Sequence, residues 1–384
     1  MNISGSFARR SKADAYTFCV IPALETLDWH RFLGRPALRF SEPAAQSNLR
    51  ARRILVTGAG GSIGSALACR LQQIEPGRLI LLEASEGRLF GLQGRLSRLQ
   101  VAREPTFVLG DAGDADLLEE LFAEHHPDLV IHTAAYKHVP LLEHQPLAAI
   151  ENNIFVTETL AAAAAKRDAQ VVFLSTDKAV EPASVMGATK RVAEEIVLAK
   201  GGTAVRLANV LASSDSVAEI FARQVAGGEP LTVTQRTAER YFITIAEAVD
   251  LLVCAAEWAE TGQLLAPALS VSHRIGDLAE FMVRELGGGR PAQILYTHPR
   301  PGDKEAERMW AGNESAVQAD GQSLVSIAAR LHEKHAWAAA LDRLHAAVAA
   351  RELPAALDEL RYLAPGYRPS ATVLALASRS ELRV

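Results

Sequence analysis

The sequence contains few cysteines and no long apolar run. Its three cysteines, Cys19, Cys69 and Cys254, lie far apart among 384 residues. Scattered thiols argue against a disulfide framework and a zinc site, and they are typical of a reducing compartment. No stretch reaches the ~18 apolar residues of a membrane-spanning helix, and the N-terminus lacks the apolar core of a signal peptide. We therefore expect a cytoplasmic protein without a membrane span or a metal site.

The chain also lacks a surplus of positive charge. Its 40 Lys and Arg residues are balanced by 45 Asp and Glu residues, which gives a formal net charge of -5. This balance gives no electrostatic reason to expect nucleic acid or an anionic membrane as a partner.

Strand-like and helix-like segments alternate in the first half of the chain. Apolar runs such as ILVTG (54–58) are typical of buried strands, and SIGSALACRLQQI (62–74) has helical spacing. The alternation predicts an α/β fold with a Rossmann-like, doubly wound parallel sheet and a smaller C-terminal substrate-binding region. We predict four regions: an N-terminal arm (1–50), a dinucleotide-binding domain with the catalytic residues (51–205), the substrate-binding region (206–315) and a helical extension (316–384).

Glycines recur at every third position in VTGAGGSIGS (56–65), between a predicted strand and a predicted helix. Gly58, Gly61 and Gly64 permit a tight turn, a close approach of the backbone to a pyrophosphate, and a helix N-terminus that points at this anion. The pattern predicts a dinucleotide site that includes Ser62 and Ile63. A purely structural turn is the alternative.

Two acidic residues follow the next two strands. Glu83 would accept hydrogen bonds from the adenosine ribose and repel a 2′-phosphate, which favours NAD over NADP. A solvated loop acid is the alternative reading of Glu83. Asp111 either reaches the adenine or caps a helix. The remaining candidates on the cofactor side are Ala112, Ala134 and Ala135.

The later motifs resemble a known family. The stretches AAYKHVPLLEHQPLAAIENN (134–153), STDKAVEPASVMGATKR (175–191), GGEPLTVT (227–234), ERYFITIAEAV (239–249) and RPGDK (300–304) are similar to the CapD-like polysaccharide-biosynthesis branch of the extended short-chain dehydrogenase/reductases. The best-known members of this branch are UDP-N-acetylglucosamine 4,6-dehydratases. The resemblance implies a UDP-sugar substrate, NAD as the cofactor and a homo-oligomer.

The reaction that the resemblance implies needs an acid and a base at neighbouring carbons. NAD takes a hydride from sugar C4, the C5 proton and the C6 hydroxyl are then removed, and the hydride returns to C6. Asp177 would be the acid at the C6 oxygen, Lys178 the base at C5, and Thr176 a hydrogen-bond donor to the C4 oxygen. Lys178 must be neutral to act, and burial or the nearby Lys190 would lower its pKa. The alternative is a helix-capping Thr-Asp pair followed by a surface lysine.

Lys190 matches the family lysine that binds the nicotinamide ribose, although an exposed helix lysine is the alternative. Met186 occupies the position of the usual tyrosine base, and its thioether can neither accept nor donate a proton at C4. Because the branch includes active members with methionine here, we expect the C4 proton to pass to Asp177, Lys178 or water.

The remaining candidates concern the substrate. Lys137 and His138 follow a strand on the cofactor side, and a loop histidine is more often structural than catalytic. Asn209 and Ser216 lie on a loop that departs from the family at Ala212 and Ala218. The resemblance also implies a uracil pocket and diphosphate-binding arginines, which would be Thr232, Thr234, Arg240 and Arg300.

Two other functions are open at this point. A C4 epimerase or 4-reductase needs no acid–base pair at C5 and C6, so the adjacent Asp177 and Lys178 favour dehydration. A catalytically silent NAD- or sugar-nucleotide-binding protein is favoured by Met186 and by the altered 212–218 loop.

Overall fold

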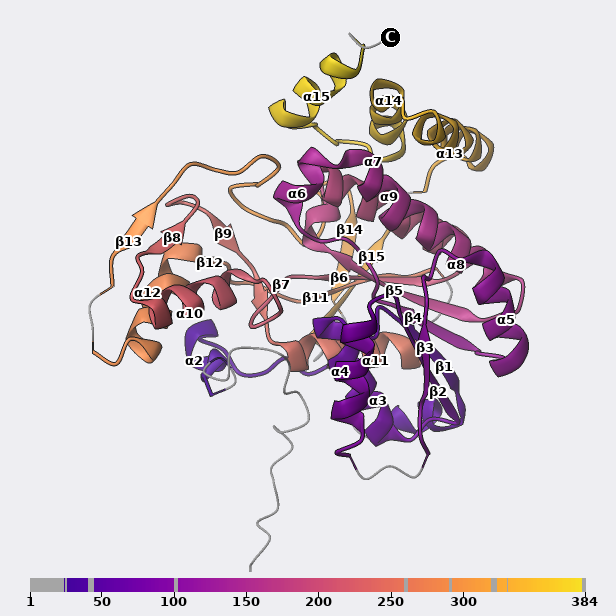
Figure 1. Ribbon diagram of the computed structural model, residues 1–384, viewed down its shortest axis with the longest axis horizontal. Helices are drawn as coiled ribbons and strands as arrows, with labels where there is room; N and C mark the ends of the chain where they lie inside the picture. Colours follow the sequence, from indigo (N-terminus) through magenta and orange to yellow (C-terminus); the bar gives the residue numbers. More distant parts are fainter. Residues whose placement is uncertain are drawn as a thin grey trace, which may run out of the picture.

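A central sheet with helices on both faces organises the computed structural model (Figure 1). Within the described residues the sheet has nine strands in the order β14-β15-β11-β6-β5-β4-β1-β2-β3, and β1 to β6 and β11 run parallel. The order β3-β2-β1-β4-β5-β6 confirms the predicted Rossmann-like fold. The structure describes residue 24 and residues 26–40, 45–99, 103–258, 262–289, 292–318, 323–329 and 331–381.

Strand β1 lies between β4 and β2, with Thr57 opposite both His132 and Leu82. Its apolar run is buried on both faces, as expected for a central parallel strand. The carboxyl ends of parallel strands meet at one edge, so the loops after β1, β2, β4 and β5 gather there. The strands of the sheet are β1 (Arg53–Thr57), β2 (Arg78–Glu83), β3 (Thr106–Leu109), β4 (Leu129–His132), β5 (Gln170–Thr176), β6 (Thr203–Leu207), β11 (Leu264–Pro267), β14 (Ser315–Gln318) and β15 (Leu324–Ala328).

Helices α3 and α11 pack together on one face of the sheet, and α5, α8 and α9 pack on the other (Figure 1). Three short helical segments connect β4 to α8, and the last of them, η3, is a π-helix. The 3₁₀ segment η2 (Ala45–Ala51) precedes β1. The helices of this part are α3 (Ser62–Ile74), α4 (Glu86–Leu96), α5 (Ala115–His125), α6 (Val139–His144), α7 (Pro146–Ile150), η3 (Glu151–Phe155), α8 (Val156–Ala165), α9 (Val185–Ala199) and α11 (Ile245–Trp258).

A smaller region is built from short strand pairs and two helices. The described part of the predicted N-terminal arm packs on it, since the ring of Phe32 in α2 (Trp29–Leu33) lies 5.3 Å from that of Phe281. Arg35 also donates to the carbonyl oxygen of Phe242 at 3.1 Å and forms an ion pair of 2.6 Å with Glu247 of α11. Residues 26–40 are therefore attached both to this region and to α11. Its elements are β7 (Asn209–Val210), α10 (Val217–Gly227), β8 (Leu231–Val233), β9 (Glu239–Arg240), β10 (Phe242–Ile243), β12 (His273–Arg274), α12 (Ile275–Leu286) and β13 (Ile294–Tyr296).

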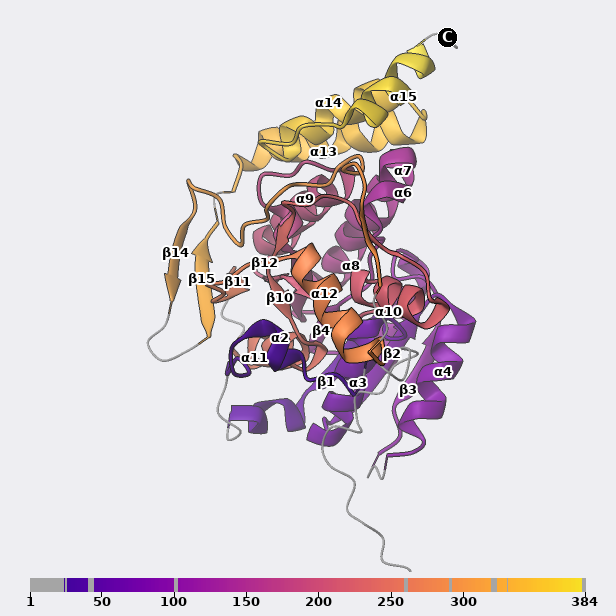
Figure 2. The ribbon, with the colours of Figure 1, turned by 90° about the vertical axis from the view of Figure 1, so that its left-hand side faces the viewer.

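The C-terminal helices α13 (Lys334–Ala349), α14 (Leu353–Leu363) and α15 (Ala371–Glu381) form a layer beyond α9 (Figure 2). Leu344 and Leu360 share a buried apolar cluster with Met186 of α9. The prediction of a helical extension over 316–384 is wrong for its first part, because β14 and β15 form an antiparallel hairpin at the edge of the sheet, beside β11. The four region boundaries stay predictions. None of the helices in the described part of the chain combines the length and apolar character that crossing a bilayer requires.

Candidate active site

The glycine-rich turn forms a cradle at the carboxyl end of β1. Gly58 has a φ of +65°, and a Cβ there would lie 2.6 Å from the backbone nitrogen of Ala134. A Cβ on Gly64 would lie 2.2 Å from the carbonyl oxygen of Gly58. Helix α3 begins at Ser62, directly after Gly61. A side chain at Gly58 or Gly64 would therefore distort the turn that presents the helix N-terminus.

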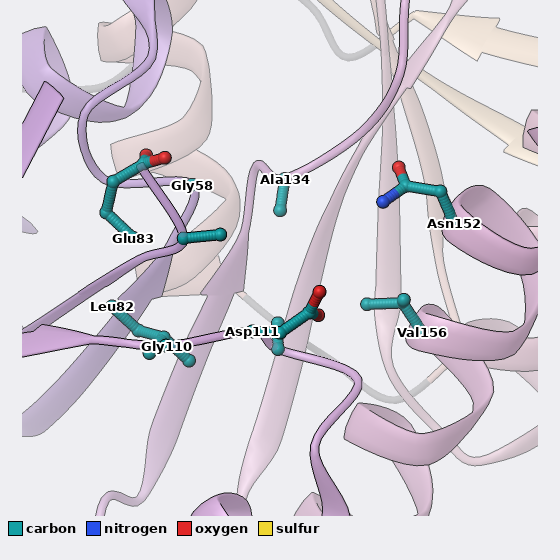
Figure 3. Close-up of a pocket in the computed structure, with 10 residues that line it drawn as sticks. Gly58, Leu82, Glu83, Gly110, Asp111, Ala134, Asn152 and Val156 are labelled. Atoms are coloured by element: carbon teal, nitrogen blue, oxygen red, sulfur yellow. The ribbon is translucent and has the colours of Figure 1, made fainter. Parts of the chain in front are cut away.

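Glu83 ends β2 beside this cradle and is buried, with an exposed fraction of 6%. Its carboxylate accepts hydrogen bonds from the backbone N–H groups of Gly60 (2.8 Å) and Ser85 (3.0 Å). The alternative of a solvated loop acid is therefore wrong. Figure 3 shows that Glu83 shares a hollow with Gly58, Asp111 and Ala134.

Asp111 does not cap a helix, because Asp114 is the N-cap residue of α5. The Asp111 carboxylate instead accepts from the N–H of Gly113 at 2.7 Å and lines the same hollow. Ala112 lines it as well, and Ala135 follows Ala134 in the loop after β4. Contacts of these residues with a nucleotide stay predictions.

The run Thr176–Asp177–Lys178 lies at the carboxyl end of β5, where the strand passes into the short 3₁₀ helix η4 (Asp177–Ala179). The ammonium of Lys178 donates to Asp177 Oδ1 at 2.9 Å and to Asn209 Oδ1 at 2.7 Å. Thr176 donates its hydroxyl to Asp177 Oδ1 at 3.0 Å. Asp177 is fully buried. The alternative of a surface lysine is therefore wrong, because Lys178 is held in a polar cluster.

Sequence reasoning missed Glu307 in this cluster. Its buried carboxylate lies 3.7 Å from the Lys178 nitrogen and 3.0 Å from the Lys304 nitrogen. The RPGDK motif ends three residues before Glu307, and only the fold shows that this segment returns to β5.

The ionisation of the pair differs from the prediction. Burial alone would lower the pKa of Lys178, but the carboxylates of Asp177 and Glu307 outweigh it and leave this pKa above its usual value. The expected lowering by burial or by Lys190 is therefore wrong. Burial and the nearby Glu307 raise the pKa of Asp177, although Lys178 opposes them. Asp177 therefore binds a proton more readily than an ordinary aspartate does, and Lys178 is protonated in the free protein.

Helix α9 carries Met186 and Lys190 into the protein interior. Ser184 caps the helix by accepting from the N–H of Gly187, and Met186 is buried in the first turn. The nitrogen of Lys190 lies 3.9 Å from the ring centre of Phe173, and the residue is 4% exposed. Burial lowers the pKa of Lys190 to about 7. The alternative of an exposed helix lysine is wrong.

Asn153 is a second residue that sequence reasoning missed. It lies in the π-helix η3, a rare turn that is frequent at functional sites. Its side-chain oxygen accepts from the N–H of Tyr136 at 2.9 Å, and its nitrogen donates to the hydroxyl of Thr189 at 3.0 Å. Asn153 therefore ties the loop after β4 to α9 beside Lys190.

The loop between β7 and α10 bridges the cradle and the smaller region. Ser62 and Ser214 are linked through their hydroxyl groups at 2.8 Å, and Lys137 donates to the Ser214 carbonyl oxygen at 2.6 Å. His138 lies 3.8 Å from Asp215. Ser216 accepts from the N–H of Glu219 as the N-cap of α10. The structure thus places Lys137 and His138 beside the loop that contacts the glycine-rich turn, and it gives Ser216 a structural contact.

The other substrate candidates have different surroundings. Thr232 accepts from Gln224 on an exposed face, and Thr234 follows β8. Arg240 is buried and donates to the carbonyl oxygens of Glu239 and Lys304, both at 2.7 Å. Arg300 is half exposed and pairs with Asp303 at 2.8 Å. Binding of uracil or diphosphate by these residues stays a prediction.

The departure from the family at Ala212 has a measurable consequence. Ala212 adopts a φ of +58°, a left-handed conformation that costs a residue with a Cβ about 1–2 kcal/mol. We expect Ala212→Gly to raise the free energy of unfolding by about 1 kcal/mol in chemical denaturation. Ala218→Gly, inside α10, is the control and should lower it, because glycine weakens a helix. Equal effects of the two substitutions would contradict this account.

Comparison with known proteins gives consistent matches. A family model described as polysaccharide biosynthesis protein matches residues 54–329. The probable polysaccharide biosynthesis protein EpsC of Bacillus subtilis is 38% identical over 295 residues, which are 73% of this chain and 49% of EpsC. The capsular polysaccharide biosynthesis protein CapD of Staphylococcus aureus is 36% identical over 302 residues, which are 76% of this chain and 50% of CapD. The chain thus spans about half the length of these curated relatives. The structure of Pen from Bacillus thuringiensis has 27% identity and a TM-score of 0.69, covering 74% of this chain and 90% of Pen.

Proposed function

The chain belongs to the CapD-like polysaccharide biosynthesis family of extended short-chain dehydrogenase/reductases, and we propose that it is an NAD-dependent nucleotide-sugar dehydratase. It would convert a UDP-N-acetylhexosamine, with UDP-N-acetylglucosamine as the first candidate, to a UDP-4-keto-6-deoxy sugar. The observation that carries the proposal is the pair of Asp177 and Lys178, 2.9 Å apart at the same sheet edge as the glycine cradle.

The glycine-rich turn fits a dinucleotide because its backbone is packed so closely that only glycine is accommodated at Gly58 and Gly64. The absence of a Cβ at Gly58 and Gly64 leaves room for the turn that would hold the pyrophosphate, and Glu83 would receive the adenosine ribose. Lys190 would contact the nicotinamide ribose. NAD held there would supply the hydride chemistry at C4 and C6. The C4 hydroxyl proton would pass to Asp177, Lys178 or water, and the Lys178 ammonium would return a proton to C5.

The paired acid and base can balance the protons of the elimination step, in which water is lost across C5 and C6. Transfer of one proton along the 2.9 Å hydrogen bond converts the ion pair into a neutral Lys178 amine and an Asp177 carboxylic acid. The amine then takes the C5 proton, and the acid protonates the C6 oxygen, which leaves as water. These steps restore the ion pair with no net gain or loss of protons, and the raised pKa of Asp177 supports its role as the acid.

Met186 supports a second candidate function, because its thioether cannot accept the C4 hydroxyl proton. A protein that binds NAD and a UDP-sugar without turnover would tolerate this residue. Against this candidate, the Thr176–Asp177–Lys178 run keeps groups that can accept the proton, and Lys178 remains within hydrogen-bond distance of Asp177.

Incubation with UDP-N-acetylglucosamine in heavy water tests the proposal. Dehydration predicts loss of one water by mass spectrometry and deuterium at C5 by proton NMR. An unchanged mass with interconverted C4 epimers would indicate an epimerase. No change with related UDP-sugars, with NAD confirmed bound, would support the silent binding protein. Light scattering of the same sample tests the predicted homo-oligomer.

A further inference from the structure

We propose that Glu307 is a positioning residue for Lys178, whose nitrogen it holds at the end of β5 while Asp177 carries the proton. The inference deepens the proposed dehydratase and rests on it for its catalytic meaning. It assigns a role to a buried carboxylate that the acid–base steps above do not use.

The Lys178 ammonium has two hydrogen-bond acceptors, Asp177 and Asn209, and the Glu307 carboxylate forms a longer ion pair with it. Asp177 Oδ1 lies at 2.9 Å, Asn209 Oδ1 at 2.7 Å and Glu307 Oε1 at 3.7 Å. The first comes from β5, the second from β7 and the third from the segment after RPGDK. Glu307 is thus the member of this set that remains anionic when Asp177 is protonated.

Glu307 is itself buried and paired with two lysines. Its side chain is 2% exposed, and its second oxygen pairs with the Lys304 ammonium at 3.0 Å. Lys304 also donates at 2.6 Å to the carbonyl oxygen of Val180, two residues after Lys178. Arg240 donates to the Lys304 carbonyl oxygen at 2.7 Å. Burial would raise the pKa of Glu307, but three nearby cations hold it below its usual value: Lys178, Lys304 and Arg240. Glu307 therefore stays anionic at neutral pH.

The proton transfer between Lys178 and Asp177 creates the need for such a residue. After the transfer Lys178 is a neutral amine and Asp177 a neutral acid that must turn its proton toward the C6 oxygen, so the contact between them weakens and the amine is positioned by its other neighbours. Without Glu307, a long and flexible lysine side chain would keep only the neutral Asn209 as a partner. The Glu307 carboxylate would also recapture the ammonium after Lys178 has taken the C5 proton.

The first test does not depend on turnover. Glu307→Gln removes the charge and keeps the shape, and Glu305→Gln is the matched control, because it removes an exposed carboxylate two residues away. The pH dependence of Lys178 acetylation by a limiting amount of acetic anhydride is read by peptide mass spectrometry. We expect the midpoint to move to lower pH in Glu307→Gln alone, because an anion that favours the ammonium is lost. The same midpoint in wild type and both variants would overturn the inference.

The second test separates positioning from folding. Glu307→Gln is expected to lower kcat by about a hundredfold, since a misplaced base reacts slowly, with KM almost unchanged. The rise of kcat with pH, which follows the loss of a proton from Lys178, should occur at lower pH in Glu307→Gln. The conservative variant Glu307→Asp should recover part of the rate. Wild-type rates in a folded Glu307→Gln protein would overturn the inference while the dehydratase stands. No turnover by wild type would contradict the dehydratase, and the acetylation midpoints would still decide the role of Glu307.

Discussion

Replacement of Lys178 with methionine is expected to lower the rate of dehydration by about 10²–10⁴-fold, the usual contribution of a general base. Methionine fills a similar volume but cannot accept the C5 proton. The measurement is steady-state formation of the 4-keto-6-deoxy product, together with deuterium incorporation at C5 in heavy water. Both should fall together, because the same proton transfer is lost.

Lys200→Met is the matched control for this variant. Lys200 is an exposed lysine at the C-terminal end of α9, away from the cluster around Asp177. Its replacement should leave the rate unchanged. A wild-type rate in Lys178→Met, with the control also normal, would remove Lys178 from the reaction and return the C5 base to an open question.

Replacement of Arg206 with alanine is expected to lower the free energy of unfolding by about 3–5 kcal/mol, the usual cost of breaking a buried ion pair on one side. Arg206 is fully buried and uses all five of its N–H donors. They bind both oxygens of Glu194 (2.8 and 2.9 Å), both oxygens of Glu314 (2.7 and 3.0 Å) and the carbonyl oxygen of Met309 (3.2 Å). Removal of Arg206 would take this buried cation away from both carboxylates, although Arg191 would remain 3.1 Å from Glu194.

Urea denaturation at several pH values measures this effect. Burial would raise the pKa of Glu194, but Arg206 and its hydrogen bonds hold it below the usual value. The wild-type stability that this provides is present at neutral pH and is lost as the pH falls through the range where Glu194 takes up a proton. The gap between wild type and variant should therefore narrow in acid. The control is Arg343→Ala, which breaks the exposed pair with Glu359 and should change little. Equal losses in the two variants would contradict the account.

The sequence predicted the parts of the site that depend on the carboxyl edge of a parallel sheet. Gly58 and Thr176 end apolar runs at β1 and β5, and the parallel sheet brings the carboxyl ends of these strands to one edge. The buried position of Glu83 beside the cradle follows from the same geometry. Local pattern and fold class were sufficient for these residues.

Other features depend on contacts between distant segments. Glu307 reaches Lys178 across a separation of more than a hundred residues, and its charge changes the direction of the lysine pKa shift. Asn153 lies in the π-helix η3, which the sequence pattern does not indicate. The strands β14 and β15 lie in a part of the chain that was expected to be helical. The pairing of β15 with β11 and β14 joins segments that a local pattern does not connect.

Transfer of the hydrogen atom from C4 to C6 tests the central claim most directly. UDP-N-acetylglucosamine carrying deuterium at C4 is incubated with the protein in ordinary water, and the product is examined by NMR and mass spectrometry. A 4,6-dehydratase that uses Asp177 and Lys178 predicts deuterium in the C6 methyl group of a product that has lost one water. Deuterium that stays at C4 of an isomer with unchanged mass would contradict the dehydratase and identify an epimerase.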